Sequence, residues 1–270
     1  MKRSVGNFME LKKHIQLLLA SVRIETMDRM MDSISFSFLT IGTLVRVAIS
    51  VIFFQALYGV SGSIAGWGIN ELYILLGTWF VIDGLSWATY TRGFQSRAPR
   101  MIENGDLDRF LVLPVNTKLF LSYRYIDIIF TTPSIVAGIL IFLWGATHMT
   151  GEIHVFTYIL FLILAIWIHY SVSVILGAIN FYHILEMPMY LRNSIMRLGQ
   201  YPVSIYHGAV KLIFSFVVPL AFMFSVPADV FINGADLRQW GVMIGVGVVF
   251  HLFSSFLWNN GLKRYESANG

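Results

Sequence analysis

Six long apolar runs constrain what this chain can fold into more than any other feature of its sequence. A hydrocarbon core roughly 30 Å thick needs about 20 consecutive apolar residues in a helix. The composition agrees, because 56% of the residues are hydrophobic and only 13% are charged. We therefore expect an all-α integral membrane protein whose six transmembrane helices form one domain over residues 34–260. The predicted spans are residues 34–58, 69–91, 119–145, 155–180, 208–226 and 239–259.

The lysines and arginines orient these spans. All 19 except Arg46 and Arg238 lie before residue 34, in the stretch 92–124, around residues 192–211 or in the tail 261–270. Basic residues accumulate in cytoplasmic loops, so we expect both termini to be cytoplasmic. The net charge of +4 is then a sign of topology and not of nucleic-acid binding. The absence of cysteine from the sequence excludes disulfides and thiolate metal sites.

The N-terminal segment 1–33 has the pattern of an amphipathic helix. Its apolar residues recur at spacings of three and four, whereas its lysines lie elsewhere on the helical wheel. Such a helix suits the cytoplasmic head-group layer, and we expect no cleavable signal peptide before it. An ordinary membrane-proximal helix without a partner is the alternative. The apolar positions are Phe8, Leu11, Ile15, Leu18 and Val22.

Arg46 and Asp83 lie well inside predicted spans, where an isolated charge is costly. Counted from the cytoplasmic ends, Arg46 is 12 residues deep and Asp83 about eight, or roughly 18 and 12 Å at the helical rise per residue. A long arginine side chain bridges that difference, so we predict an intramembrane Arg46–Asp83 ion pair. A packing clamp between neighbouring helices is the favoured role, and contact with a substrate is the alternative.

Proline and glycine single out three further spans. Pro133 predicts a kink in the third span. Pro219 and Pro227 interrupt the short fifth span, and broken helices in transporters often mark the pathway. Gly241 and Gly245 give the sixth span a small-residue face for helix packing, which suits a subunit interface.

Catalytic and nucleotide-binding patterns are almost absent from the sequence. No HExxH or other metal-ligand spacing occurs, so no metal site is expected. Gly59-Val60-Ser61-Gly62 matches the GxSG pattern of intramembrane serine proteases, but it falls in a non-cytoplasmic loop. No GxxxxGK[ST] phosphate loop is present, so active transport needs an ion gradient or a partner ATPase. Because Asp83 is the one clearly buried carboxylate, a partner ATPase is favoured.

Two stretches resemble a known family. Residues 101–114 read Met-Ile-Glu-Asn-Gly-Asp-Leu-Asp-Arg-Phe-Leu-Val-Leu-Pro, which is similar to the I-x-x-G-x-L-D-x-x-L-x-x-P signature of ABC-2-type ABC transporter permeases. Residues 197–206 and 218–222 also resemble one bacterial branch of these permeases. The similarity covers nearly the whole chain.

The resemblance implies a coupling helix between spans two and three that docks on a separate nucleotide-binding subunit. Apolar side chains would enter a cleft of that subunit, while charged neighbours would fix the register. Gly105 would end a helical turn, and Pro114 would block continuation into the third span. The docking residues implied are Arg100, Glu103, Gly105, Asp106, Leu107, Asp108, Arg109, Phe110, Leu111 and Pro114. A smaller second contact is expected over residues 182–200, through Glu186, Arg192 and Arg197.

The expected function is therefore that of a permease subunit in a bacterial cell membrane. It would couple ATP hydrolysis by its partner to movement of an unknown substrate, with export favoured over import. ATP and Mg²⁺ would bind to the partner, and no cofactor or catalytic site is expected in this chain. A second permease, identical or related, and membrane lipid would be the other partners. The alternative is an ion-gradient-driven transporter or channel that needs no ATPase.

Overall fold

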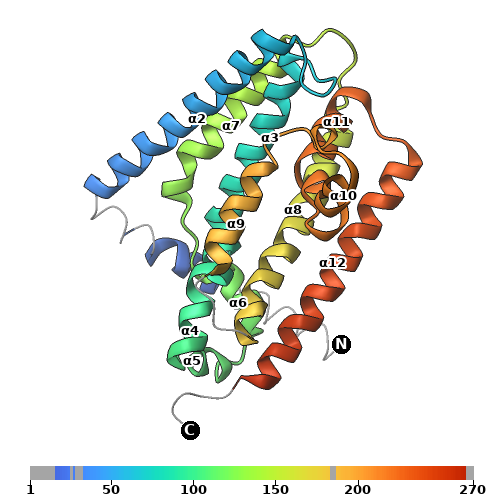
Figure 1. The fold of residues 1–270 in the computed structure, drawn as a ribbon. Coiled ribbons are helices and arrows are strands. Elements are labelled where there is room, and N and C mark those ends of the chain that lie inside the picture. Colours follow the sequence, from blue (N-terminus) through green and yellow to red (C-terminus); the bar gives the residue numbers. More distant parts are fainter. Residues whose placement is uncertain (1–15, 25–26, 28–32, 183–186, 266–270) are drawn as a thin grey trace, which may run out of the picture.

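The computed structural model describes residues 16–24, 27, 33–182 and 187–265. Regular structure in these residues is helical, apart from an isolated bridge between Ile64 and Trp67. Five helices are long and apolar enough to cross a membrane, which confirms an all-α membrane protein. They are α2 (Ser33–Ser61), α3 (Ile69–Ser86), α7 (Ile128–Thr147), α8 (Val155–Ala178) and α12 (Leu237–Arg264). Figure 1 shows α2, α3 and α7 in the upper part of the molecule, and α8 and α12 extending to its lower end.

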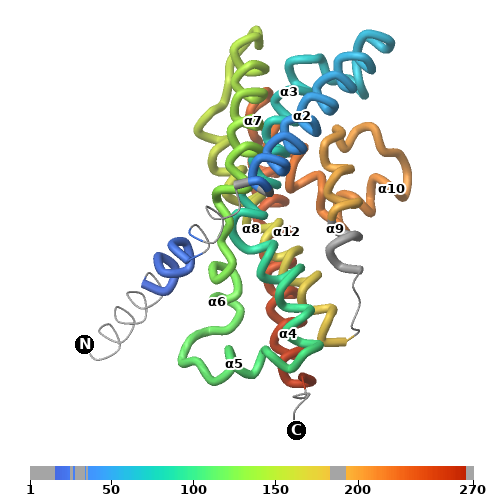
Figure 2. The backbone as a smooth tube through the Cα atoms, turned by 90° about the vertical axis from the view of Figure 1, so that its left-hand side faces the viewer, coloured from blue at the N-terminus to red at the C-terminus, as the bar shows by residue number. Residues whose placement is uncertain are grey.

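The second membrane helix does not stop at the edge of its apolar run. The π-helical turns η1 (Trp87–Thr91) and η2 (Gly93–Arg97) connect α3 directly to α4 (Ala98–Asn104). Helical backbone thus runs from residue 69 to residue 104, roughly 54 Å at the helical rise per residue. Figure 2 shows α4 reaching the same end of the molecule as the last turns of α12. We call this the α4 end, and we call the end that carries residues 62–68 the loop end.

Three prolines each follow a π-helical turn by two residues. Pro99 follows η2, Pro219 follows η5 (Ile213–Val217), and Pro227 follows η6 (Ala221–Ser225). A proline has no N–H to donate four residues back, and its ring crowds that carbonyl. The wider π turn provides the space. Pro227 consequently sits in the first turn of α11 (Val226–Asn233) without breaking it, contrary to the break predicted there.

The third predicted span, 119–145, is divided into two helices. α6 (Thr117–Arg124) ends at a short irregular stretch, and α7 begins only at Ile128. Each helix has its own cap, because the Asn116 side chain accepts from the Leu119 N–H at 3.0 Å and the Asp127 side chain accepts from the Phe130 N–H at 3.4 Å. The predicted span ran across this break, although Arg124 and Asp127 lie on either side of it.

Four glycines hold α3 and α7 together. Gly77 and Gly84 lie seven residues apart on α3, as do Gly138 and Gly145 on α7, so each pair shares one helix face. A Cβ atom on Gly77 would lie 2.6 Å from the Gly138 carbonyl oxygen. The predicted small-residue face on α12 is different, since a Cβ atom on Gly241 or Gly245 meets nothing within 4 Å. Those two glycines do not pack helices within the chain.

The chain also crosses the molecule in a region that the sequence assigned to a cytoplasmic loop. α9 (Met187–Leu198) lies beside α3 in Figure 1, where the Trp79 indole N–H donates to the Met196 carbonyl at 2.7 Å. The Ser50 hydroxyl donates to the Gln200 side-chain oxygen at 3.4 Å, and the Ser204 hydroxyl donates to the Ala65 carbonyl at 3.2 Å. Residues 187–205 therefore make a further crossing from the α4 end towards the loop end.

The predicted fifth span over residues 208–226 is a bent segment instead. Its two halves, Gly208–Val217 and Ala221–Asn233, differ in direction by 68° around Pro219. The segment starts just after Ser204 at the loop end and returns there, where the Phe231 carbonyl accepts from the His154 N–H at 3.0 Å. Lys211, which the sequence grouped with the cytoplasmic charges, belongs to this segment in α10 (Gly208–Leu212).

The N-terminal amphipathic helix lies partly outside the described residues. Its positions Phe8, Leu11 and Ile15 are among the residues that the structure does not describe. Residues 16–24 are helical, and Val22 packs against an apolar cluster on and just after α6. The described part of this helix therefore contacts the same end of the molecule that carries α4.

Candidate functional site

The polar stretch 97–114 forms the tip of the helix that begins at residue 69. α4 ends at Gly105, whose φ of +75° is a left-handed conformation that glycine adopts without steric penalty. The Leu107 N–H then donates back to the Met101 carbonyl at 3.2 Å, and the short α5 (Asp108–Leu111) follows. We call residues 105–114 the tip segment. Gly105 is the residue in the sequence that allows the chain to turn back after α4.

Leu107 holds the tip segment to the rest of the chain. Its side chain is fully buried in a cluster with Leu121 of α6 and Trp258 of α12. The expectation that Leu107 inserts into a cleft of a partner is therefore wrong, because its side chain has no exposed surface. The sequence indicates that an apolar residue such as Leu107 is buried, but not whether its own chain or a partner buries it.

The exposed apolar surface of the tip segment lies a few residues further on. Leu111, Val112 and Leu113 expose 41%, 80% and 39% of their surface. Phe110 is half-buried, with its ring 5.5 Å from the ring of Phe120. Three side chains of the predicted charged set are also exposed, and one of them, Arg109, pairs with Asp106 at 3.2 Å. The exposed members are Arg100, Glu103 and Arg109.

The end of α12 supports the tip segment from the other side. Tyr265 lies beside Asp108 and in the cluster that contains Leu107. Burial, and then the negative charge of Asp108, raises the pKa of the Tyr265 phenol above its usual value of 10.0. The phenol is therefore uncharged at neutral pH, as an apolar cluster requires.

A buried ion pair ties α3–α4 to the start of α7. The Arg92 guanidinium lies 3.0 Å from the Asp127 carboxylate, and their side chains are only 15% and 10% exposed. The Asp127 N–H also donates to the Ala88 carbonyl at 2.8 Å. That carbonyl lies in η1, where π-helical geometry interrupts the usual ladder of helical hydrogen bonds. Sequence reasoning counted Arg92 among the topology charges and missed Asp127, which hydropathy places inside the third span.

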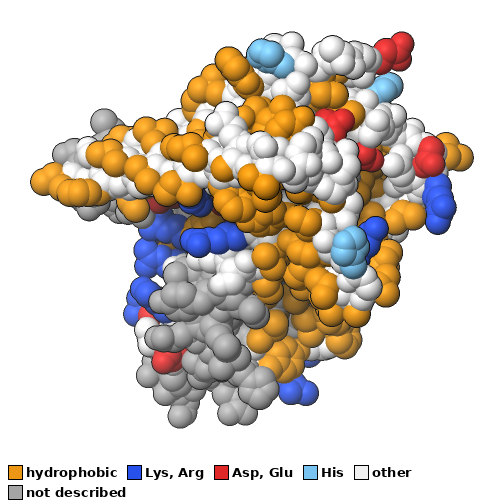
Figure 3. Space-filling view, turned by 45° about the horizontal axis from the view of Figure 1, so that its top comes forward, with side chains coloured by type: hydrophobic (Ala, Val, Ile, Leu, Met, Phe, Trp, Pro, Cys, Tyr) orange, Lys and Arg blue, Asp and Glu red, His pale blue; other side chains and the backbone are white. Residues whose placement is uncertain are grey.

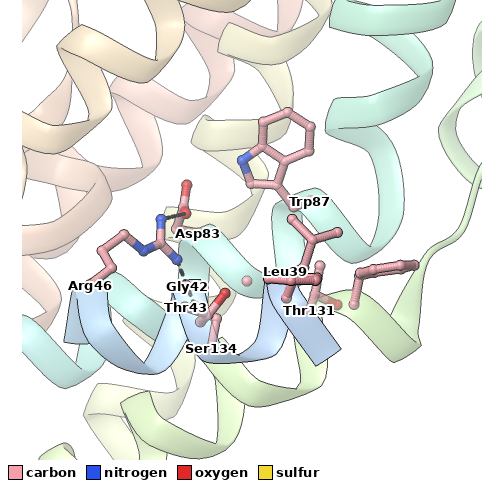
Figure 4. Close-up of a pocket in the computed structure, with 11 residues that line it drawn as sticks. Leu39, Gly42, Thr43, Arg46, Asp83, Trp87, Thr131 and Ser134 are labelled. Carbon is pink, nitrogen blue, oxygen red and sulfur yellow. Dashed lines mark hydrogen bonds and ion pairs between the residues drawn. The ribbon is translucent and has the colours of Figure 1, made fainter. Parts of the chain in front are cut away.

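Arg46 and Asp83 meet between α2 and α3, as shown in Figure 4. The guanidinium lies 3.9 Å from the Asp83 carboxylate and donates to the Ser134 hydroxyl at 3.4 Å. It also faces the rings of Trp79 and Phe80, whose centroids are 5.9 and 5.5 Å away. Asp83 is almost fully buried, whereas the Arg46 side chain is 40% exposed. The two groups are therefore within ion-pair distance, although the contact is long.

Two cavities adjoin this pair. The larger, about 420 Å³, lies between α2, α3 and α7. The smaller, about 190 Å³, lies between α2, α3 and α9. Arg46, Asp83 and Trp87 line both of them. Arg197, which we expected in a second contact with the partner, lines the smaller cavity instead.

The remaining predicted positions show no assembled chemistry. Ser61 of the GxSG pattern donates to the Leu57 carbonyl at 2.8 Å, an ordinary bond of a serine in a helix. Glu186 lies outside the described residues, and the structure does not describe the Arg192 side chain. No group of three or more potential metal ligands occurs in the part of the chain that was described. Pro133 lies inside α7, six residues into that helix.

Comparison with known protein families identifies the family of this chain. No curated protein is significantly similar to the chain. The sequence profile of a family described as "ABC-2 family transporter protein" matches residues 44–269, which is most of the chain. The matched region includes the tip segment, the Arg46–Asp83 pair and every crossing after the start of α2. The chain therefore belongs to the ABC-2 family of transporter proteins and is a multi-pass membrane permease of an ABC transporter.

Proposed function

We propose that the chain is the membrane subunit of an ATP-driven exporter, powered by a separate nucleotide-binding ATPase that docks on the tip segment. ATP and Mg²⁺ bind to that ATPase, because the sequence of this chain has no phosphate-binding loop. The permease itself carries out no catalysis in this proposal. The family supplies the association with an ATPase, and the place of docking is our inference.

The observation that carries the proposal is the exposed apolar run at Leu111, Val112 and Leu113. It lies outside every predicted span, so lipid tails do not cover it. The exposed Arg109 precedes it in the same short helix and segment, and an interface with an apolar centre has such charged residues at its rim. Leu107 and Tyr265 hold the segment to α6 and α12, so a force on the run reaches the membrane helices.

Continuous helix explains how a movement of the ATPase would reach the membrane. The tip segment is joined to α3 through α4 and the two π turns without an intervening loop. The Arg92–Asp127 pair makes α7 follow the same helix. Closure of the ATPase on ATP would then move α4, the two π turns and the start of α7 together.

The α4 end faces the cytoplasm in this proposal. The basic residues of the stretch 92–124 and the tail 261–270 lie at this end, and the positive-inside rule places such residues in the cytoplasm. ATP is available on that side. Both termini are then cytoplasmic and the membrane is the bacterial cell membrane.

A second permease, identical or related, completes the pathway. The outer surface of α2 is apolar and exposed over most of its length, for example at Phe38, Ile41 and Ile52. Lipid and a second permease together would cover this surface. The open face of α12 at Gly241 and Gly245 offers another place for close helix contact.

Affinity purification in mild detergent tests the docking site. We expect a P-loop ATPase to co-purify with the chain, and Val112→Asp to remove at least nine tenths of it. Val60→Asp is the matched control, because Val60 is 90% exposed at the loop end. An ATPase that stays bound to the Val112→Asp variant would overturn the docking site, and a fully active solitary permease driven by an ion gradient would overturn the proposed function.

A further inference from the structure

The two cavities around Arg46 contain more positive than negative charge. Asp83 is the carboxylate that lines them, whereas Arg46 lines both and Arg197 lines the smaller one. Asp83 lies eight residues, or about 12 Å, from the end of the apolar span at Thr91. Among the described residues that line the two cavities there are thus two guanidinium groups and one carboxylate.

The Arg46 guanidinium is held in a defined position. The faces of Trp79 and Phe80 lie on one side of it, and Ser134 accepts one of its N–H groups at 3.4 Å. Its contact with Asp83, at 3.9 Å, is longer than the 2.7–2.9 Å of a strong charge-assisted hydrogen bond. The guanidinium is thus fixed and partly exposed, and the Asp83 carboxylate does not bind it closely.

Polar groups converge on the smaller cavity. Arg46, Asp83 and the side chain of Asn193 line it together with Arg197. Guanidinium groups match the oxygens of phosphate and carboxylate, and two of them reach a common space here. The smaller cavity is therefore suited to an anionic group with several oxygen atoms.

The larger cavity adds an apolar lining beside the same arginine. Phe38 and Leu39 of α2 and Phe130 of α7 contribute to it. Figure 3 shows basic side chains gathered in a recess below the long apolar helix that projects to the left, which is α2 in Figure 1. A molecule with an anionic group at Arg46 would therefore have apolar surface directly next to it.

We propose that the double cavity binds the anionic head group of an amphiphile. The guanidinium groups of Arg46 and Arg197 hold the phosphate or carboxylate oxygens, and the apolar lining between α2 and α7 takes the first part of the hydrocarbon chain. Binding itself does not depend on the ATPase partner. The assignment of the amphiphile as transport cargo, as opposed to a membrane lipid, rests on the proposed function.

Native mass spectrometry of the purified full chain tests the site. The probes are dioleoyl phosphatidylglycerol and dodecyl phosphate as anions, with zwitterionic dioleoyl phosphatidylcholine, which has no net charge, as the reference. We expect the anions to bind at least tenfold more tightly than the reference. Arg46→Gln and Arg197→Gln should each lose about tenfold of the anion affinity, the usual effect of removing a charged hydrogen-bond donor.

Two further variants control for charge and folding. Arg238→Gln removes an equivalent charge at the loop end, where Arg238 is exposed, and should leave anion binding unchanged. Asp83→Asn removes the competing carboxylate and should keep or increase the affinity. Because Arg197 is exposed, its variant should keep the melting temperature of the parent. Equal binding of anions by the parent and both cavity variants, or equal binding of the uncharged reference, would overturn the site.

A second measurement separates cargo from lipid. Dodecyl phosphate is added to the permease–ATPase complex in phosphatidylcholine nanodiscs, and ATP hydrolysis is recorded. A severalfold stimulation that disappears in Arg197→Gln assigns the amphiphile as cargo, whereas binding without stimulation assigns it as a lipid. Absence of any ATPase complex would remove the proposed function and leave the binding result intact.

Discussion

Arg92 and Asp127 form a 3.0 Å ion pair that joins the second membrane helix to the start of the third. The Asp127 backbone also donates to Ala88, and the Asp127 side chain caps α7 at the Phe130 N–H. One residue therefore closes the break between α6 and α7 and fixes it to the π turn in the opposite helix. The irregular stretch between α6 and α7 is consequently a fixed corner.

The Arg92–Asp127 pair should contribute strongly to stability. Asp127→Asn leaves a largely buried guanidinium without its counter-charge, so we expect a loss of about 3 kcal/mol in the free energy of unfolding. The exposed pair of Arg109 and Asp106 supplies the control, since Arg109→Gln should change that free energy by less than about 0.5 kcal/mol. Reversible unfolding in detergent, followed by circular dichroism, measures both. Equal stability of the two variants would contradict a structural role for the buried pair.

The close contact of α3 with α7 should not tolerate a methyl group. Gly77→Ala places a Cβ atom 2.6 Å from backbone atoms of α7, which cannot move without shifting the helix. We expect a loss of roughly 2 kcal/mol from this overpacking. Gly241→Ala meets open space and should be neutral or slightly stabilising, because alanine favours helix. Thermal unfolding of the two single variants decides between a contact surface and a mere helix-propensity effect.

Substitution of Leu107 should lower the stability of the protein, whereas substitution of Val112 should leave it unchanged. Leu107→Ala removes a fully buried side chain, and we expect it to destabilise the protein by about 3 kcal/mol. Val112→Ala shortens an 80% exposed side chain and should leave stability within about 0.5 kcal/mol of the parent. Melting temperatures of both proteins in the same detergent provide the test. A destabilised Val112→Ala variant would mean that Val112 is itself packed against the chain.

The crossing by residues 187–205 should be visible in labelling experiments. The sequence contains no cysteine, so single cysteines can be introduced without background. Ser204→Cys and Lys211→Cys should react with a membrane-impermeant maleimide added outside intact cells, as should the Val60→Cys control at the loop end. Val112→Cys should react only after the cells are permeabilised. Protection of the residue-204 and residue-211 cysteines from outside would restore the sequence-predicted loop.

Hydropathy predicts the membrane class and the long helices, because apolar length alone decides whether a helix can span the bilayer. It could not separate α6 from α7, since Asp127 acts through hydrogen bonds and not through hydropathy. It also misplaced the fifth crossing, because polar residues such as Asn193 and Arg197 lower the hydropathy of α9. The depths of Arg46 and Asp83 in their spans predicted that the two residues lie near each other. The sequence did not predict that Arg197 lines the same cavity, because that depends on the path of α9. For the tip segment, the sequence likewise did not show that the chain itself buries Leu107.

The length of the helix from residue 69 to residue 104 determines how far a tilt would displace the end of α4. Gly84 is the last point at which α3 touches α7 through a glycine, and α4 ends 20 residues beyond it. Treated as a lever of about 30 Å pivoting there, the helix would displace its far end by roughly 5 Å for a tilt of about 10°. Asp83 lies next to the pivot and would hardly move. In the proposed mechanism, a large displacement of the tip segment would thus cause only a small movement beside Arg46.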